Sequence, residues 1–395
     1  MYLSKEEEDI LNGNNGELLA QLMRLLVELG DSFGAEKLID IISAHTVLNF
    51  GLNFVNAAAD VLHRMARSGL KVKVRTTADP IIDMEYKEDL SIVYPMFTLH
   101  DQMMDDLAKL GVAGFTCTPY FLDNKPRFGD HCAWSESSAV IYLNSVIGGR
   151  SNREGGLVDL ACAILGKTAY HGFHITENRK GDILFKIGED VDITRRFNLT
   201  SIGLRIGEIA GSRIPVVEGL NNISLDNLKN LGAASASTGA VALIHVLGIT
   251  PEAKSLEDAF QNDDPEEIVD IEKKDLEEVR EKYSTEWKKP PANIAIGCPQ
   301  LSKAEVIEVL EHLENKKILD GVNFWICTNP ETKNEIKQSG YSNILKNSGA
   351  KITSLCPLLT ALPRPVTTNS AKTCFYSNAT YRDLDTCIKI ATEGL

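Results

Sequence analysis

The sequence has no long hydrophobic run and no excess of basic charge. Nowhere do about 18 apolar residues follow one another, as a membrane-spanning helix would need, and the N-terminus MYLSKEEEDI is acidic. Lys and Arg number 41 against 55 Asp and Glu, which gives a net charge of −14 at pH 7. Binding to nucleic acid or to an anionic membrane needs a broad cationic face, so the composition argues against both partners. We expect a soluble, cytoplasmic protein that holds any anion locally.

Cysteine is sparse and widely spaced. The sequence holds 8 cysteines and lacks the dense pattern of a secreted disulfide scaffold. They lie at Cys117, Cys132, Cys162, Cys298, Cys327, Cys356, Cys374 and Cys387. In a reducing compartment we expect a few, at strand ends, to be metal or cluster ligands and the others to be buried.

Length and hydrophobic pattern predict an α/β protein with more than one domain. At 395 residues, of which 43% are hydrophobic, the chain exceeds the usual size of a single core. Its N-terminal part alternates between strands and helices. Helices are expected over residues 16–29, 54–68, 97–110 and 135–147, and strands over residues 40–45, 71–75, 182–187 and before Cys117. The small residues within 231–246 predict a tight contact between a helix and a sheet.

A change of composition marks the expected domain boundary. Residues 251–290 are strongly acidic, and we interpret them as a linking excursion with one or two solvated helices. They separate an N-terminal α/β region, residues 1–250, from a C-terminal lobe, residues 291–395. In this lobe strands are expected over residues 293–299, 323–328 and 351–357, and helices over residues 302–313 and 331–338. The alternation predicts a parallel sheet whose ligands gather at the carboxyl ends of the strands.

The run from residue 113 to residue 156 carries the densest candidate chemistry. Pro119 follows Cys117 and ends the apolar approach, which turns the thiol outward. The run closes on the loop GGRSNREGG, residues 148–156, whose backbone N–H groups and guanidinium groups can reach a carboxylate or a phosphate. A buried cysteine and a solvated loop would explain each feature alone, whereas their crowding favours a site.

Three cysteines share one local pattern, in which an apolar strand ends in the thiol and proline follows directly or one residue later. The strings are Thr116-Cys117-Thr118-Pro119, Gly297-Cys298-Pro299 and Leu355-Cys356-Pro357. Three converging thiolates suit an iron–sulfur cluster with one iron left open for substrate. Zinc in a structural site would normally need a fourth protein ligand. At this point a cluster and three unrelated buried cysteines both remain open.

Longer motifs resemble those of a known family. They are TCTPY (116–120), FGDHCAWSESSAV (128–140), GGRSNREGG (148–156), HITENRKG (174–181), GCPQLSKAEV (297–306) and TNSAK (368–372). These strings closely resemble the catalytic part of aconitase X, a divergent branch of the aconitase superfamily, over nearly the whole chain. The resemblance implies several α/β lobes with mostly parallel sheets around a central cleft. It also implies a hydro-lyase in which an iron–sulfur cluster helps to expel a hydroxyl as water.

The resemblance also implies roles for individual residues. Cys117, Cys298 and Cys356 would bind the cluster, which we expect to be [4Fe-4S], although [3Fe-4S] and [2Fe-2S] forms also suit three thiolates. Cys162 and Cys327 are assigned to the core. The residues expected around the substrate are Ser43, His45, Thr76, Thr77, Ser137, Arg150, Asn152, Arg153, Asn369, Ser370 and Lys372. For each of these a structural hydrogen bond is the alternative.

The catalytic base is not found among these residues. In the superfamily a swivelling domain supplies a catalytic serine, and in aconitase X this domain is either fused or a separate small subunit. We expect it to be absent from this chain and to come from a small-subunit partner, with the active site at the interface.

The motifs give conflicting indications of the substrate. Known members of the family dehydrate cis-3-hydroxy-L-proline or 5-phosphomevalonate. Asp130-His131 and Glu154-Gly155-Gly156 look like the archaeal members that act on 5-phosphomevalonate, whereas KGDILFKI and ITPEAKSLEDAF look like the hydroxyproline type. We favour a small hydroxy acid such as cis-3-hydroxy-L-proline and keep phosphomevalonate as the alternative.

Two other function classes were weighed. A non-catalytic scaffold subunit that binds an iron–sulfur cluster would keep the cysteines while losing turnover. A dinucleotide-binding enzyme is suggested by the C-terminal α/β lobe alone, and the sequence lacks a G-x-G-x-x-G turn after a strand.

Overall fold

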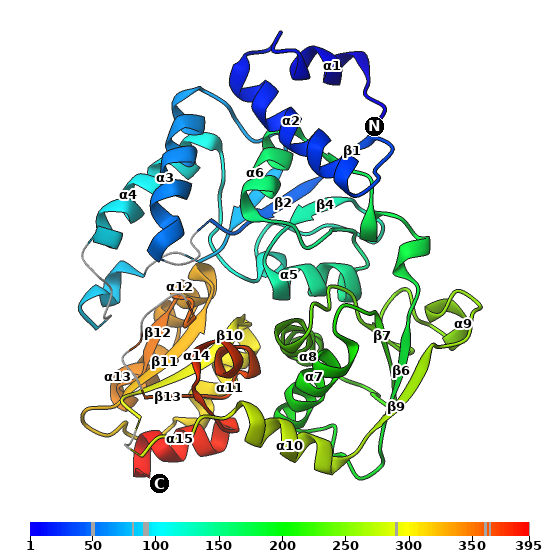
Figure 1. Ribbon diagram of the computed structural model, residues 1–395. Coiled ribbons are helices and arrows are strands. Elements are labelled where there is room, and N and C mark those ends of the chain that lie inside the picture. Colours follow the sequence, from blue (N-terminus) through cyan, green and yellow to red (C-terminus); the bar gives the residue numbers. More distant parts are fainter. Residues whose placement is uncertain are drawn as a thin grey trace.

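The computed structural model describes residues 1–48, 52–80, 83–89, 95–288, 291–358, 362 and 365–394. Its helices and strands form an N-terminal, a middle and a C-terminal lobe, each with its own parallel sheet (Figure 1). Each lobe also has its own hydrophobic core. Among the described strands, only β1 and β5 pair in antiparallel fashion. The predicted fold class, several α/β lobes with mostly parallel sheets, is confirmed.

The N-terminal lobe is built on a short parallel sheet with the strand order β3-β2-β4. Its strands are β1 (Leu38–Asp40), β2 (Ser43–Thr46), β3 (Arg75–Ala78), β4 (Cys132–Trp134) and β5 (Lys167–Ala169). Its helices are α1 (Lys5–Leu11), α2 (Glu17–Ser32), α3 (Leu52–Arg67), α4 (Pro95–Leu110), α5 (Ser137–Tyr142) and α6 (Gly156–Leu165). The expected helices over residues 16–29, 54–68 and 97–110 are therefore present.

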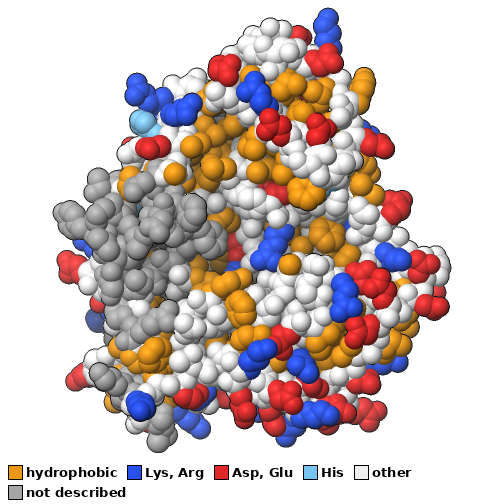
Figure 2. All heavy atoms as spheres, in the orientation of Figure 1, with side chains coloured by type: hydrophobic (Ala, Val, Ile, Leu, Met, Phe, Trp, Pro, Cys, Tyr) orange, Lys and Arg blue, Asp and Glu red, His pale blue; other side chains and the backbone are white. Residues whose placement is uncertain are grey.

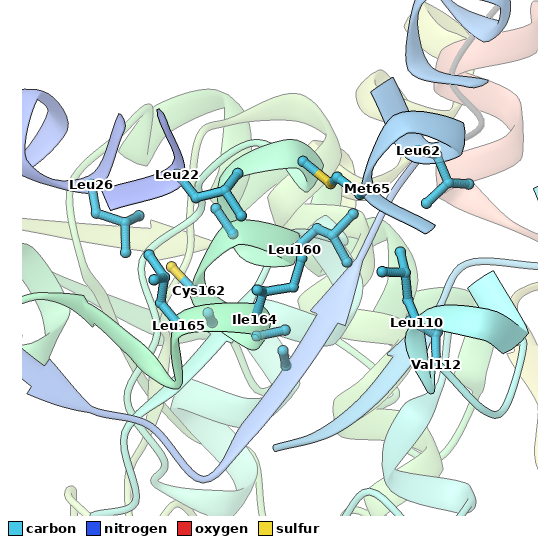
Figure 3. Packing of buried hydrophobic residues seen from close by; sticks show 14 of the residues in the cluster. Leu22, Leu26, Leu62, Met65, Leu110, Val112, Leu160, Cys162, Ile164 and Leu165 are labelled. Atoms are coloured by element: carbon cyan, nitrogen blue, oxygen red, sulfur yellow. The ribbon is translucent and has the colours of Figure 1, made fainter. Parts of the chain in front are cut away.

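Apolar faces of α2 and α3 close over α6 in the core of this lobe (Figure 3). Leu22 and Leu26 of α2 pack with Leu160 and Leu165 of α6, and all four side chains are buried. Cys162 lies among them with 0% exposure, which confirms its predicted place in the core.

Three strands expected in the N-terminal lobe were wrong in detail. The strand expected over residues 40–45 is two strands in two sheets, because Ile41 N–H bonds to the Gly166 carbonyl and Ile42 N–H to the His131 carbonyl. The next strand begins at Arg75 and not at residue 71, since the preceding N–H groups bond to the ends of α4 and α6. Before Cys117 the described chain forms a single bridge at Phe115.

The helix expected over residues 135–147 also differs. It begins at Ser137 and is capped by the Glu136 side chain, which accepts a hydrogen bond from Ala139 N–H at 2.8 Å. It continues as a π-helix over Leu143–Ile147. A carboxylate therefore occupies the cap position, where it is favoured by the exposed N–H groups of the first turn.

The middle lobe has a parallel sheet with the strand order β8-β7-β6-β9. The strands are β6 (Ile183–Ile187), β7 (Pro215–Glu218), β8 (His245–Val246) and β9 (Glu267–Ile271), and the helices are α7 (Arg196–Ala210), α8 (Leu225–Thr238), α9 (Leu256–Ala259) and α10 (Lys273–Tyr283). The strand expected over residues 182–187 is confirmed. The acidic stretch 251–290, which we expected to link two domains, contributes β9, and β9 pairs with β6 in this sheet.

Small residues bring α7 and α8 close together. A Cβ atom added at Gly203 of α7 would lie 2.4 Å from the Leu231 carbonyl oxygen, and one at Gly207 would lie 2.4 Å from that of Ser235. The tight contact expected for residues 231–246 is therefore between two helices and not between a helix and a sheet.

The C-terminal lobe has a parallel sheet with the strand order β12-β11-β10-β13-β14. The strands are β10 (Asn293–Leu301), β11 (Asn323–Thr328), β12 (Lys351–Thr353), β13 (Val366–Thr368) and β14 (Thr380–Tyr381). The helices are α11 (Lys303–His312), α12 (Pro330–Gln338), α13 (Ser342–Ser348), α14 (Ala371–Ser377) and α15 (Leu384–Glu393). The predicted elements are present, but the strand expected over residues 351–357 ends at Thr353, so Cys356 follows the strand and is not its tip. Ser302 caps α11 through a capping box with Glu305.

The surface mixes charges of both signs. On the face shown in Figure 2, acidic and basic side chains alternate over the lower part of the molecule. Within the described part of the chain, no helix is both long enough and apolar enough to cross a membrane.

Candidate active site

Cys298 leaves the regular ladder of β10. Gly297 has φ 103°, and a Cβ atom there would lie 2.5 Å from the Cys327 carbonyl oxygen, so only glycine suits this position. The pairing of β10 with β11 shifts between Ile296 and Leu301. Cys298 therefore lies in a distorted part of the strand, inside β10 and not at its tip.

The other two predicted ligands approach Cys298 from different segments. Cys356 follows the end of β12, and Cys117 precedes a short 3₁₀ helix, Pro119–Phe121. Cys298 and Cys356 share a side-chain hydrogen bond, which lowers the pKa of Cys298 and raises that of Cys356. Burial raises the pKa of Cys117, and the charge of Cys298 adds to this effect. The three thiols, each 6–7% exposed, thus lie within interaction range of one another.

Gln300 connects all three cysteine segments, and the sequence analysis missed it. Its Oε1 atom accepts hydrogen bonds from Thr116 Oγ1 at 2.7 Å and from Cys117 N–H at 3.3 Å. Its Nε2 atom donates to the Ser354 carbonyl at 2.9 Å, and its backbone N–H donates to Cys117 Sγ at 3.3 Å. The only hint in the sequence was the GCPQ string, which places this amide two residues after Cys298.

A buried ion pair lies beside the thiols. Lys372, at the start of α14, contacts the Glu136 carboxylate and lies 3.1 Å from Ser137 Oγ. Burial opposes the charge on Lys372, but Glu136 and then Cys298 raise its pKa above the ordinary value. Burial likewise opposes the charge on Glu136, and Lys372 lowers its pKa. The structure therefore brings the predicted residues Ser137 and Lys372 together next to the cysteines.

A polar network extends from β2 and β3 on the other side. His45 Nδ1 lies 2.9 Å from Thr77 Oγ1, and His45 Nε2 lies 3.2 Å from Asp79 Oδ1. Asn124 donates to Thr77 Oγ1 at 2.9 Å and accepts from Ser43 Oγ at 2.5 Å. Three of the predicted residues, Ser43, His45 and Thr77, thus share one network, because side chains two apart on a strand point to the same face.

Asp79 connects this network to the thiols. Burial raises its pKa to about 6, although the hydrogen bond with His45 lowers it. Its charge in turn raises the pKa of Cys117 and of Cys356. Thr76 points to the opposite face of β3, where its hydroxyl donates to the Val74 carbonyl at 2.9 Å, so the structure does not bring it into the network.

Three side chains of the basic loop, residues 148–156, point to different parts of the molecule. Arg150 Nη1 donates to the His174 carbonyl at 2.8 Å. Asn152 is buried and bonds to His171 and Glu154, with Phe173 N–H donating to its Oδ1 at 2.9 Å. Arg153 is exposed and donates to the Ala236 carbonyl on α8, a helix that contacts α14. The structure brings neither Arg150 nor Asn152 into contact with the described thiol surroundings.

The remaining predicted residues lie at the start of α14. Ser370 caps this helix by accepting from Thr373 N–H at 3.1 Å, and its hydroxyl also donates to the Cys298 carbonyl. Asn369 is half-buried and directly precedes this cap. Within the described ranges, no set of three His, Cys, Asp or Glu side chains already has a metal-coordinating geometry. Three buried thiols from separate segments, beside a cationic Lys372, are nevertheless a donor set that suits an iron–sulfur cluster.

Comparison with known proteins identifies the family. Three family models match in order: aconitase X first domain over residues 1–177, second domain over 181–281 and third domain over 292–393. These ranges correspond to the three lobes. A crystal structure titled Thermococcus kodakaraensis aconitase X (holo-form) matches with a TM-score of 0.88 and 35% identity, over 99% of this chain and 100% of that one.

Several curated relatives are named dehydratases. The phosphomevalonate dehydratase large subunit of Methanocaldococcus jannaschii is 37% identical over 95% of each chain. That of Methanosarcina mazei is 37% identical over 100% of this chain and 98% of its own. The cis-3-hydroxy-L-proline dehydratase of Hypocrea jecorina is 29% identical over 99% of this chain and 69% of its own. The expected enzyme class, hydro-lyase, is confirmed, and the chain belongs to the aconitase X family.

Proposed function

We propose that this chain is the large subunit of a phosphomevalonate dehydratase. The observation that carries the proposal is the 37% identity to two phosphomevalonate dehydratase large subunits over at least 95% of both chains. The hydroxyproline relatives are 29% and 27% identical, and this chain covers 69% of their length. The comparisons thus favour our alternative over the substrate that we preferred from the sequence.

The conflicting motifs explain that preference. KGDILFKI forms β6 and its approach, and ITPEAKSLEDAF surrounds α9, so both lie in the middle lobe. Neither contributes to the network of Cys117, Lys372 and His45. Sequence motifs outside the site reflect the packing of the lobe and carry little information about the substrate.

Cys117, Cys298 and Cys356 would hold an iron–sulfur cluster. When bound, a cluster with one iron free of protein ligands supplies a Lewis acid for the departing hydroxyl. The hydrogen bonds of Gln300 fix the backbone around Cys117 and Ser354, two residues before Cys356. The buried cation of Lys372 offsets part of the negative charge of the thiolates.

The polar groups around the thiols would bind the substrate and hold protons. Lys372 would provide a cation for its anionic groups, Arg153 would add a second from its place against α8, and Ser43 and Thr77 would orient the network behind His45. Asp79, whose pKa burial raises to about 6, would hold a proton beside His45, which lies 3.2 Å away. The small subunit, expected from the large-subunit names of the relatives, would supply the remaining base.

The decisive experiment is an assay of the reconstituted complex. The chain is purified anaerobically with its small subunit, supplied with iron and sulfide, and incubated with (R)-5-phosphomevalonate or with cis-3-hydroxy-L-proline. Loss of one water is followed by mass spectrometry. Turnover of phosphomevalonate alone supports the proposal, whereas turnover of hydroxyproline alone overturns it. A reconstituted, brown complex that dehydrates neither compound favours a non-catalytic scaffold.

The ligand assignment has its own test. Changing Cys117, Cys298 or Cys356 to alanine should abolish visible absorbance and most bound iron after reconstitution. Cys387→Ala is the matched control, because Cys387 is a buried cysteine in the core of the C-terminal lobe. Full iron content in any of the three site variants would remove that residue from the ligand set.

A further inference from the structure

A cavity lies where the N-terminal and middle lobes meet. Its volume is about 360 Å³, which lies in the range of small-molecule sites. Its walls include Phe128, Arg150, Arg179, His245, Glu252 and Lys254. None of these residues belongs to the network around the thiols. Arg150, which we expect from its sequence motif to bind substrate, lines this cavity.

Two of the cationic groups in this cavity have no acidic partner. Glu252 is occupied by Arg179, whose Nε atom donates to its two oxygens at 3.0 and 2.9 Å. Asp258, the other acid in the wall, accepts from Ser255 N–H at 3.1 Å and caps α9. Among the described residues, no carboxylate lies within 4.0 Å of Arg150 or of Lys254. The cavity therefore has a surplus of positive charge.

Neighbouring bases reflect this surplus. Burial lowers the pKa of His131, and the charge of Arg150 lowers it further. Burial also lowers the pKa of His174 to about 3, with smaller contributions from adjacent imidazoles, Arg179 and Arg150. Burial is the larger cause for both imidazoles, and the smaller effect of Arg150 is that of a positive charge, which also favours a bound anion.

His245 adds a requirement for a hydrogen-bond donor. Its side chain is 2% exposed, and its Nε2 atom lies 2.8 Å from the Arg179 carbonyl oxygen. A carbonyl accepts, so Nε2 carries the hydrogen and Nδ1 is left as an acceptor. This Nδ1 atom has no partner among the described residues. A buried acceptor without a donor costs free energy that a ligand hydroxyl can recover.

We propose that this cavity binds a small hydroxylated anion, either a phosphate monoester or a hydroxycarboxylate. Its anionic group lies between Arg150 and Lys254, and its hydroxyl donates to His245 Nδ1. A guanidinium bound through one N–H to the His174 carbonyl still presents further N–H groups to such an anion. The site is separate from the thiols and does not depend on the proposed dehydratase activity.

Isothermal titration calorimetry on the full chain tests the site. Glycerol 3-phosphate and glycerate are the probes for the two anion classes, and methyl phosphate is the probe without a hydroxyl. We expect at least one hydroxylated probe to bind and methyl phosphate to bind more weakly. Arg150→Gln should weaken binding by about tenfold or more, and Lys254→Gln by several-fold. Lys274→Gln is the control, because that lysine lies on α10 and pairs with Glu272.

Three results would overturn the proposal. The first is the absence of heat with both hydroxylated probes up to about 10 mM, where even a weak site is occupied. The second is unchanged affinity in Lys254→Gln, an exposed position that tolerates substitution without unfolding. The third is binding that Lys372→Gln abolishes while Arg150→Gln leaves it intact, because the anion would then occupy the thiol-lined site.

Discussion

At the scale of single residues, the chemistry of this protein depends on side chains that support the cysteines. The three thiols belong to segments that share no secondary-structure element, and Gln300 is the group that contacts or approaches all of them. Its side chain is the partner of the Cys117 N–H and the Ser354 carbonyl, and it shares the Thr116 hydroxyl with Thr118. Its contribution therefore exceeds that of an ordinary surface amide.

Replacing Gln300 by alanine should destabilise the site. The change leaves the Cys117 N–H and the Ser354 carbonyl without this partner, whereas the Thr116 hydroxyl keeps Thr118, at a cost of about 2–3 kcal/mol of unfolding free energy. We also expect reduced iron content after reconstitution, measured by elemental analysis. Gln338→Ala, at an exposed position at the end of α12, is the control and should be neutral. Wild-type stability and iron content in Gln300→Ala would show that the amide is dispensable.

Asp79 should make the free energy of unfolding depend on pH in a predictable direction. Its folded pKa of about 6 exceeds its ordinary value, because burial disfavours the carboxylate. Between about pH 4 and pH 6 the unfolded chain ionises first, so the contribution of Asp79 to stability falls as the pH rises. Asp79→Asn should equal wild type in unfolding midpoint near pH 4 and exceed it at pH 7, by up to about 3 kcal/mol in unfolding free energy.

The measurement for Asp79 is urea unfolding of both proteins across this pH range. His45 keeps an acceptor in Asp79→Asn, so the comparison isolates the charge. A wild-type protein more stable than the variant at pH 7 would show that the ionised carboxylate, paired with a charged His45, is the stable form.

At the scale of elements, two helices of the middle lobe, α7 and α8, pack through glycines and not through large side chains. Gly203 and Gly207 of α7 leave no room for a Cβ atom against α8. Helix propensity alone would reward alanine at both positions by about 1 kcal/mol. The close contact leaves room only for glycine, so at these positions the packing of α7 against α8 outweighs the higher helix propensity of alanine.

Gly207→Ala should destabilise the middle lobe by about 2 kcal/mol or more, because the added carbon would lie 2.1 Å from Thr238 Oγ1 and 2.4 Å from the Ser235 carbonyl oxygen. Thermal unfolding followed by circular dichroism measures the effect. Gly340→Ala is the control, since a Cβ atom there meets nothing within 4 Å and the change should be neutral or slightly stabilising. A stabilised Gly207→Ala would mean that the two helices can separate at little cost.

The elements also show what the sequence could predict. Strands and helices of the C-terminal lobe follow a regular hydrophobic alternation, and the Ser302 cap is a local signal, so both were predicted correctly. The split of residues 40–45 between two sheets depends on where Ile41 and Ile42 find partners far along the chain. No local sequence pattern contains that information, because the hydrogen-bond partners of these two residues lie about 90 or more residues further along the chain.

For the site residues, the strand on which a residue lies was easier to predict than the face of the sheet to which its side chain points. Ser43, His45 and Thr77 share a network, whereas Thr76 points to the other face of the same strand. Asn124 and Gln300 were missed because an amide in a loop or beside a cysteine resembles any other amide until its partners are known. Arg150 was assigned to the substrate from its loop alone, and its side chain bonds to the His174 carbonyl and lines the cavity between the lobes.

At the scale of the whole molecule, buried ion pairs join the three lobes. Lys372–Glu136 and Lys333–Asp83 join the C-terminal and N-terminal lobes, and Lys229–Glu305 joins the middle and C-terminal lobes. Removing one partner of such a pair leaves an uncompensated charge in a poorly solvated place. These pairs therefore hold the lobes in one arrangement.

Asp83→Ala should loosen the connection between the N-terminal and C-terminal lobes. It removes the 2.6 Å partner of Lys333, which keeps its 2.8 Å contact with the more exposed Glu85, and it leaves Ser354 N–H without its 3.0 Å acceptor. The expected cost is about 2–3 kcal/mol. Limited proteolysis and urea unfolding should both show the effect. Glu85→Gln is the control, because Glu85 is largely exposed and its pairs contribute under about 1 kcal/mol. Equal behaviour of the two variants would contradict a connecting role for Asp83.

The division of the cysteines between two lobes has a consequence for biosynthesis. Cys117 leaves the ribosome early, while Cys298 and Cys356 belong to the lobe that is translated last. During translation the first thiol waits without its companions, and an iron carrier that arrives then meets an incomplete chelate. A cluster held by all three thiols would therefore form only after Cys356 has been translated and the C-terminal lobe has docked on the N-terminal lobe.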